Sequence, residues 1–237
     1  MAELDASVPR VAVAVFAHPD DPEVACAGTL VRWARRGATV HLVICNRGDK
    51  GSAADDDDPD ALAEQRAAEV ADAARVMGIA SVQMLGYPDG EIDNDVRLRG
   101  RLVEVLRRLR PDAVICPDPT ALFFGDGYVN HRDHREVGMA TLDAIAPAAA
   151  SRLYFPDRGE PHQVARVYLS GTLEPDTWVD VGEAVDAKVA ALSCHRSQIG
   201  EGGEWVAELV RARAQEAGRA VGVTFAEPFR RLVLLPG

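Results

Sequence analysis

The sequence VAVAVFAHPDDPEV, residues Val11–Val24, decides the fold class of this chain. Its first part, Val11–Phe16, is an apolar run of the kind that forms a parallel strand buried on both faces. The residues directly after it, Ala17–Val24, include one histidine and three acids, which are a poor choice for packing. In open α/β sheets, ligands bind at the carboxyl ends of the strands. We therefore expect a chemical site immediately after this strand.

Strand-like and helix-like segments alternate along much of the chain. The strand-like runs are Val11–Phe16, Thr39–Cys45, Ser81–Leu85, Ala113–Cys116, Val164–Leu169 and a short final run, Phe229–Leu235. The helix-like runs are Gly28–Arg36, Ala61–Met77, Val96–Leu109, Asn130–Ala144, Val185–Leu192 and Trp205–Glu216. This alternation predicts an α/β fold in which helices cover both faces of a mostly parallel sheet, giving three layers. No internal repeat or low-complexity linker is present, so residues 1–237 are predicted to form a single domain.

A second polar cluster, Asn130-His131-Arg132-Asp133-His134, lies far along the chain. In a helix, His131 and His134 would share one face because they are three residues apart. Imidazole and carboxylate groups are the usual ligands of a catalytic zinc ion, which keeps three protein ligands and an open position. A ligand pair from Ala17–Val24 and one histidine from this second cluster would complete such a site.

The composition narrows the class of partner. The formal net charge of −11 disfavours nucleic acid and anionic membranes as partners. The N-terminus shows no signal peptide and no run is long enough to span a bilayer, so we expect a cytoplasmic protein. The four cysteines are far apart and are expected to be reduced core thiols. The acidic run Asp55–Asp60 is expected to be a solvated loop rather than a calcium site.

Several motifs follow one another in order: Ala17-His18-Pro19-Asp20-Asp21, Gly28-Thr29-Leu30, Arg66-x-x-Glu69, Gly86-Tyr87-Pro88-Asp89-Gly90 and His131-x-Asp133-His134. Together they resemble the signatures of the PIG-L (LmbE-like) family of zinc-dependent N-acetylglucosaminyl deacetylases. The resemblance extends over most of the chain, and the paired histidine motifs more than a hundred residues apart make it specific. One departure is Pro22, which stands between Asp21 and Glu23 and leaves Glu23 without an assigned role.

The resemblance implies a Rossmann-like fold and one zinc ion held by His18, Asp21 and His134, although Fe²⁺ or another divalent metal would suit the same ligands. It also implies that Asp20 is the general base and that His131 stabilises the oxyanion. Adjacent carboxylates such as Asp20 and Asp21 point in different directions on an extended backbone, so one can bind metal while the other faces water. Histidine ligands need outer hydrogen-bond acceptors, and Asp133 is a candidate for this role.

The implied reaction is hydrolysis of the N-acetyl amide of a small molecule or glycoconjugate that contains N-acetylglucosamine, with release of acetate and a free amine. The alternative is an amidase that acts on a thiol S-conjugate of a glucosaminyl compound, of the mycothiol type. Five polar residues could hydrogen-bond the sugar, or could equally be surface charges or structural pairs: Arg47, Asp49, Lys50, Arg66 and Asp89. The sequence leaves open whether the chain forms a homo-oligomer.

Two rival classes of function fit the sequence less well. A nucleotide-binding module would need G-x-G-x-x-G or a Walker loop, whereas here acids occupy the phosphate turn and would repel a pyrophosphate. A purely structural zinc site is usually rich in cysteine and has four ligands, whereas the two clusters here contain no cysteine. His41, His162 and His195 have no partner at ligand spacing and are expected to be ordinary structural residues.

Overall fold

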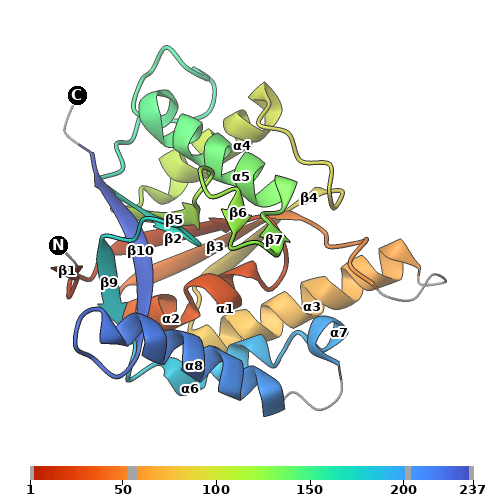
Figure 1. Ribbon diagram of the computed structural model, residues 1–237. Helices are drawn as coiled ribbons and strands as arrows, with labels where there is room; N and C mark the ends of the chain where they lie inside the picture. The colour runs from red at the N-terminus through yellow and green to blue at the C-terminus, as the bar shows by residue number, and fades with distance from the viewer. Residues whose placement is uncertain (1–2, 53–57, 201–203, 235–237) are drawn as a thin grey trace.

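The computed structural model describes residues 3–52, 58–200 and 204–234, and an eight-stranded sheet forms its centre (Figure 1). The strands are β1 (Glu3–Leu4), β2 (Val11–Phe16), β3 (Thr39–Asn46), β4 (Ser81–Tyr87), β5 (Ala113–Pro117), β8 (Arg166–Ser170), β9 (Thr177–Asp180) and β10 (Ala226–Val233). They lie in the order β1-β9-β10-β8-β5-β2-β3-β4. Strands β8, β5, β2, β3 and β4 are parallel, whereas β10 is antiparallel to β8 and β9. Two short strands, β6 (Phe123–Phe124) and β7 (Tyr128–Val129), form a separate hairpin.

Helices cover both faces of the sheet (Figure 1). They are α1 (Asp21–Ala25), α2 (Ala27–Arg35), α3 (Pro59–Met77), α4 (Val96–Leu109), α5 (Arg132–Asp143), the π-helical segment η1 (Ala144–Ala149), α6 (Val185–Leu192), α7 (Arg196–Ile199) and α8 (Glu204–Arg219). One face packs on α4, α5 and η1, and the other on α2, α3 and α6. On β2, Val13 and Val15 face the first group while Ala12 and Ala14 face the second, which is why β2 is apolar throughout. The predicted three-layer α/β/α fold is therefore confirmed.

The structure differs from the sequence prediction mainly in short elements and in boundaries. The helix expected over Asn130–Ala144 begins at Arg132, because the His131 side chain caps its N-terminus by accepting a hydrogen bond from the Asp133 amide. The strand expected from Val164 begins at Arg166, and the last strand begins at Ala226. Of the acidic run Asp55–Asp60, residues 55–57 lie outside the described residues, whereas Asp58 caps α3 and Asp60 lies in its first turn. The single-domain assignment stays a prediction. Among the described helices, each is too short or too polar to cross a membrane.

Helix α2 begins against a buried carboxylate, and this explains the Gly28-Thr29 pair of the sequence. Glu227 of β10 accepts hydrogen bonds from the backbone amides of Gly28 (2.9 Å) and Thr29 (2.7 Å) and pairs with Lys188 Nζ at 2.6 Å. A Cβ atom on residue 28 would lie 2.8 Å from the Val181 side chain, so only glycine fits there. A negative charge at a helix N-terminus is stabilising, and this contact anchors the start of α2 to β10 and α6.

Candidate metal and catalytic site

The candidate site lies at the carboxyl edge of the sheet, between the end of β2 and the start of α5. His18 and Asp20 occupy the turn after β2, and Asp21 is the first residue of α1. His131 caps α5 and His134 lies in its first turn. Helix α5 packs against β2 and its neighbour β5, so the two polar clusters of the sequence meet at one place.

Three of these side chains turn ligand atoms toward one point. His18 Nδ1 lies 3.0 Å from His134 Nε2 and 3.3 Å from an Asp21 carboxylate oxygen. The other Asp21 oxygen lies 3.1 Å from His134 Nε2. Two imidazole nitrogens and a carboxylate are the donor set of a catalytic zinc site with an open position.

The outer nitrogens of both histidines already have acceptors. His18 Nε2 lies 3.0 Å from Asp89 Oδ1, and His134 Nδ1 lies 2.9 Å from Asn130 Oδ1. Neutral rings that donate these outer hydrogens would turn two lone pairs toward each other and toward the Asp21 carboxylate. That arrangement is unfavourable unless a cation lies among the three groups, so the residues present fit a divalent metal.

The charges around His18 agree with a cation site. Burial lowers the pKa of His18, but the carboxylates of Asp21 and Asp89 outweigh burial and raise it to about 10. Burial opposes ionisation of Asp21 as well, yet His134 and His18 hold its pKa well below the usual value. A metal ion that binds here must displace a proton from His18, so we expect its affinity to rise with pH.

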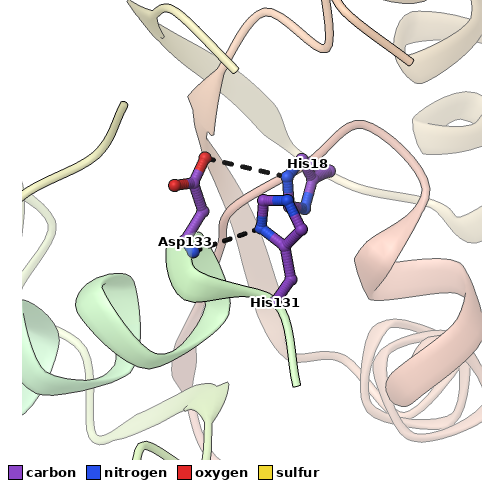
Figure 2. A group of neighbouring side chains, drawn as sticks. All are labelled: His18, His131 and Asp133. Carbon is purple, nitrogen blue, oxygen red and sulfur yellow. Dashed lines mark hydrogen bonds and ion pairs between the residues drawn. The ribbon is translucent and has the colours of Figure 1, made fainter. Parts of the chain in front are cut away.

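His131 and Asp133 lie beside His18, as Figure 2 shows. The backbone amide of Asp133 donates to His131 Nδ1 at 3.2 Å, so the neutral ring carries its proton on Nε2 and can donate from that atom. Burial and the charge on His18 keep the pKa of His131 below its usual value, which favours this neutral form. His131 is therefore a hydrogen-bond donor next to the proposed ligands.

The Asp133 carboxylate oxygen Oδ2 lies 3.8 Å from His18 Nε2, beyond hydrogen-bond distance (Figure 2). The carboxylate instead accepts hydrogen bonds from Asn46 Nδ2 (3.1 Å), Gly90 N (2.9 Å) and Ile92 N (3.3 Å). It thereby joins the last residue of β3 and the loop after β4 to α5. The two acceptors that the histidine ligands actually contact are Asp89 and Asn130, which the sequence did not assign to this role.

Asp20 lies next to the ligands in a strained backbone conformation. Its φ of 106° is in the left-handed region, which is rare for a residue other than glycine and is found at functional sites. Burial and the neighbouring Asp21 carboxylate raise the pKa of Asp20 to about 7, while the charges on His195 and Arg66 act in the opposite direction. Among the described residues, none donates a hydrogen bond to the Asp20 carboxylate, which leaves it available to accept a proton.

The five residues predicted to contact the sugar lie in the loops after β3 and β4 and on α3. Arg47 pairs with Asp49 at 2.8 Å, and the Asp49 carboxylate accepts a hydrogen bond from the Asp89 amide at 2.9 Å. Lys50 Nζ donates to the Asp89 carbonyl at 2.8 Å. Arg66 is buried, and its guanidinium donates to the Gly51 carbonyl at 3.2 Å. The loops therefore hold these side chains together, and a sugar-binding role for them stays a prediction.

Asn130 joins the loop between β5 and β6 to the site, because its Nδ2 donates to the Ala121 carbonyl at 2.7 Å while its Oδ1 faces His134. Asn130→Ala would leave His134 Nδ1 without its acceptor. We expect zinc affinity to fall about 10- to 100-fold, the usual effect of removing such a partner. Competition with a chromophoric chelator measures the affinity. An unchanged affinity would mean that Asn130 does not orient His134.

Comparison with known proteins identifies the family. The PIG-L family, described as GlcNAc-PI de-N-acetylase, matches residues 13–145, which include both histidine clusters. The chain belongs to the PIG-L family. A relative from Saccharopolyspora erythraea, 1D-myo-inositol 2-acetamido-2-deoxy-alpha-D-glucopyranoside deacetylase 2, is 33% identical over 246 residues, covering 83% of this chain and 87% of the relative.

Two solved structures resemble this PIG-L protein. N,N'-diacetylchitobiose deacetylase from Pyrococcus horikoshii superposes with a TM-score of 0.86 at 25% identity, covering 95% of this chain and 84% of that one. The 4-carboxy-2-hydroxymuconate hydratase of Pseudomonas putida has a TM-score of 0.78 at 23% identity, covering 96% of this chain and 98% of the other. Because a hydratase has the same fold, the fold alone does not determine the reaction, and the site residues do.

Proposed function

We propose that this PIG-L protein is a zinc-dependent N-deacetylase that hydrolyses the N-acetyl amide of a small molecule containing N-acetylglucosamine. The observation that carries this proposal is the convergence of His18 Nδ1, His134 Nε2 and the Asp21 carboxylate, with Asp20 and His131 beside them. The names of the relatives from Saccharopolyspora erythraea and Pyrococcus horikoshii support an N-acetylated amino sugar as the substrate class.

Each group of site residues has a separate role in amide hydrolysis. A divalent cation held by His18, Asp21 and His134 would supply Lewis acidity, which polarises a carbonyl and makes water more acidic. Asp20 accepts a proton from the attacking water, a role that suits a carboxyl group whose pKa lies near neutrality. His131 donates its Nε2 hydrogen to the oxygen on which negative charge develops. Asp20 then returns the proton to the departing amine, so that acetate and a free amine are released.

Metal removal should abolish turnover reversibly. After gentle purification we expect about one zinc per chain, because the site offers three ligands of the kind that catalytic zinc prefers. Dialysis against a chelator should stop acetate release from N-acetylglucosaminides, including N,N'-diacetylchitobiose, and added zinc should restore it. Elemental analysis measures the metal, and an acetate assay with parallel amine detection measures the reaction.

A fully active enzyme without metal would overturn the proposed mechanism. Metal binding without acetate release from any N-acetylglucosaminide would instead overturn the substrate class. Iron in place of zinc would leave the ligand assignment intact. A cytoplasmic location and assembly into a homo-oligomer both stay predictions.

A further inference from the structure

Glu23 and His195 form a buried pair that the proposed mechanism does not use. Glu23 in α1 is 1% exposed and His195, directly before α7, is fully buried. His195 Nε2 lies 3.3 Å from a Glu23 carboxylate oxygen. Neither carboxylate oxygen of Glu23 and neither ring nitrogen of His195 has an aligned hydrogen bond among the described residues. Burying such groups without hydrogen bonds costs stability, which indicates that the pair has a role other than stabilising the fold.

Glu23 is coupled to Asp20 through the backbone of α1. The amides of Glu23 and Val24 donate to the Asp20 carbonyl at 3.0 and 3.1 Å, so the first turn of α1 holds Asp20 in its left-handed conformation. Such a conformation persists only when the surrounding structure over-determines it. A contact that fixes the Glu23 side chain therefore also restrains this turn, and with it the direction of the Asp20 carboxylate.

The segment that carries His195 is hydrogen-bonded to α3 and to the loop after β3. Ser197 donates to Glu69 of α3 from its amide (2.9 Å) and its hydroxyl (2.6 Å). Gln198 Nε2 donates at 3.2 Å to the Gly51 carbonyl, which also accepts from Arg66. These contacts hold the His195–Gln198 segment against α3 and the loop after β3. They therefore fix the position from which the His195 ring contacts Glu23.

The carboxylates around His195 favour the protonated form of its ring. Burial lowers the pKa of His195, but Glu23, Asp20 and Glu69 outweigh this effect and raise it. A charged imidazole strengthens the contact with the Glu23 carboxylate, which lies 3.3 Å from Nε2.

We propose that His195, held by Glu23, is a positioning residue for Asp20. Through Glu23 it restrains the first turn of α1 and thereby the direction of the Asp20 carboxylate, and it is not one of the proposed metal ligands. This inference rests on the proposed function, because it assigns His195 an effect on the proton transfer carried out by Asp20. Glu23 and His195 then support the general base, although they lie far apart in the sequence.

The test compares His195→Gln, Glu23→Gln and the double variant E23Q/H195Q. Each single variant leaves one buried group facing a neutral amide and should lower the melting temperature, whereas the double variant removes both charges together and should recover part of it. Zinc affinity should stay within about twofold of wild type in the double variant. Its kcat should nevertheless fall about 10- to 100-fold with little change in KM, as expected when a base is misplaced.

The dependence on Asp20 is measured by repeating His195→Gln in the Asp20→Asn background. If His195 acts through Asp20, the second substitution should change kcat less than about twofold there, because coupled residues are not additive. His162→Gln is the matched control: the His162 ring is half-buried, bonds only the Pro111 carbonyl at 2.8 Å among the described residues, and its loss should leave kcat at the wild-type value.

Two outcomes would overturn the inference. In the first, E23Q/H195Q regains both stability and kcat, and the pair is then only structural. In the second, His195→Gln lowers kcat equally in the wild-type and the Asp20→Asn backgrounds, and His195 then acts by another route. Wild-type activity on the N-acetylglucosaminide is the reference throughout, so failure of the proposed function would be seen before either result.

Discussion

Asp20→Asn should retain zinc and lose turnover by about 10²- to 10⁴-fold, the usual contribution of a general base. The substitution keeps the size of the side chain but removes its ability to accept a proton. Asp20 is not among the groups whose ligand atoms converge, and no described residue donates a hydrogen bond to its carboxylate. The metal site should therefore keep its geometry. Zinc titration and acetate release measured on the same preparation separate the two properties.

Asp21→Asn is the matched variant on the adjacent residue, and it should fail in the opposite way. It replaces an anionic ligand that contacts both His18 and His134 with a neutral amide, so metal affinity should fall first. Added zinc should then restore part of its activity, whereas it should not restore that of Asp20→Asn. If Asp20→Asn loses the metal and Asp21→Asn keeps it, the two roles are assigned the wrong way round.

The long elements of the fold could be predicted because their apolar periodicity is strong. Helix Val96–Leu109 and helix Val185–Leu192 have the predicted bounds, and the parallel strands lie within a few residues of their predicted positions. The elements that the sequence did not predict are short. Helix α1 has five residues and α7 has four, too few for a hydrophobic repeat to develop. Their positions depend on contacts with distant parts of the chain.

The site shows the same division between local pattern and distant contact. The histidines and carboxylates of the two clusters could be selected because their residue types and spacing suit a metal. That Asp89 accepts from His18 could not be predicted, because the hydrogen bond depends on the path of the loop after β4. Asn130 belongs to the cluster Asn130–His134, but its contact with His134 depends on where α5 begins.

His195 is the clearest case of a residue that sequence reasoning could not place. It has no partner at ligand spacing, and the sequence indicated only an ordinary structural histidine. In the structure it lies 3.3 Å from Glu23, from which it is separated by most of the chain. A pair of this kind has no local signature, because packing of α6 and α7 against α1 and α3 brings it together.

His131→Ala should lower kcat by about 10²- to 10³-fold while the protein keeps its zinc, the cost of losing a donor to an oxyanion. His131 offers its Nε2 hydrogen because its Nδ1 accepts from the Asp133 amide. The same contact caps α5, so the alanine variant should also lose about 1 kcal/mol of stability. Acetate release, zinc content and thermal unfolding are measured together.

His131→Asn separates the two roles of this side chain. Asparagine is a good N-cap residue, so the variant should recover the stability lost in His131→Ala. Its shorter amide does not reach the position of Nε2, so kcat should stay low. Recovery of kcat together with stability would show that His131 matters for turnover only because it caps α5. Loss of zinc in both variants would instead make His131 a metal ligand and displace His134 from that role.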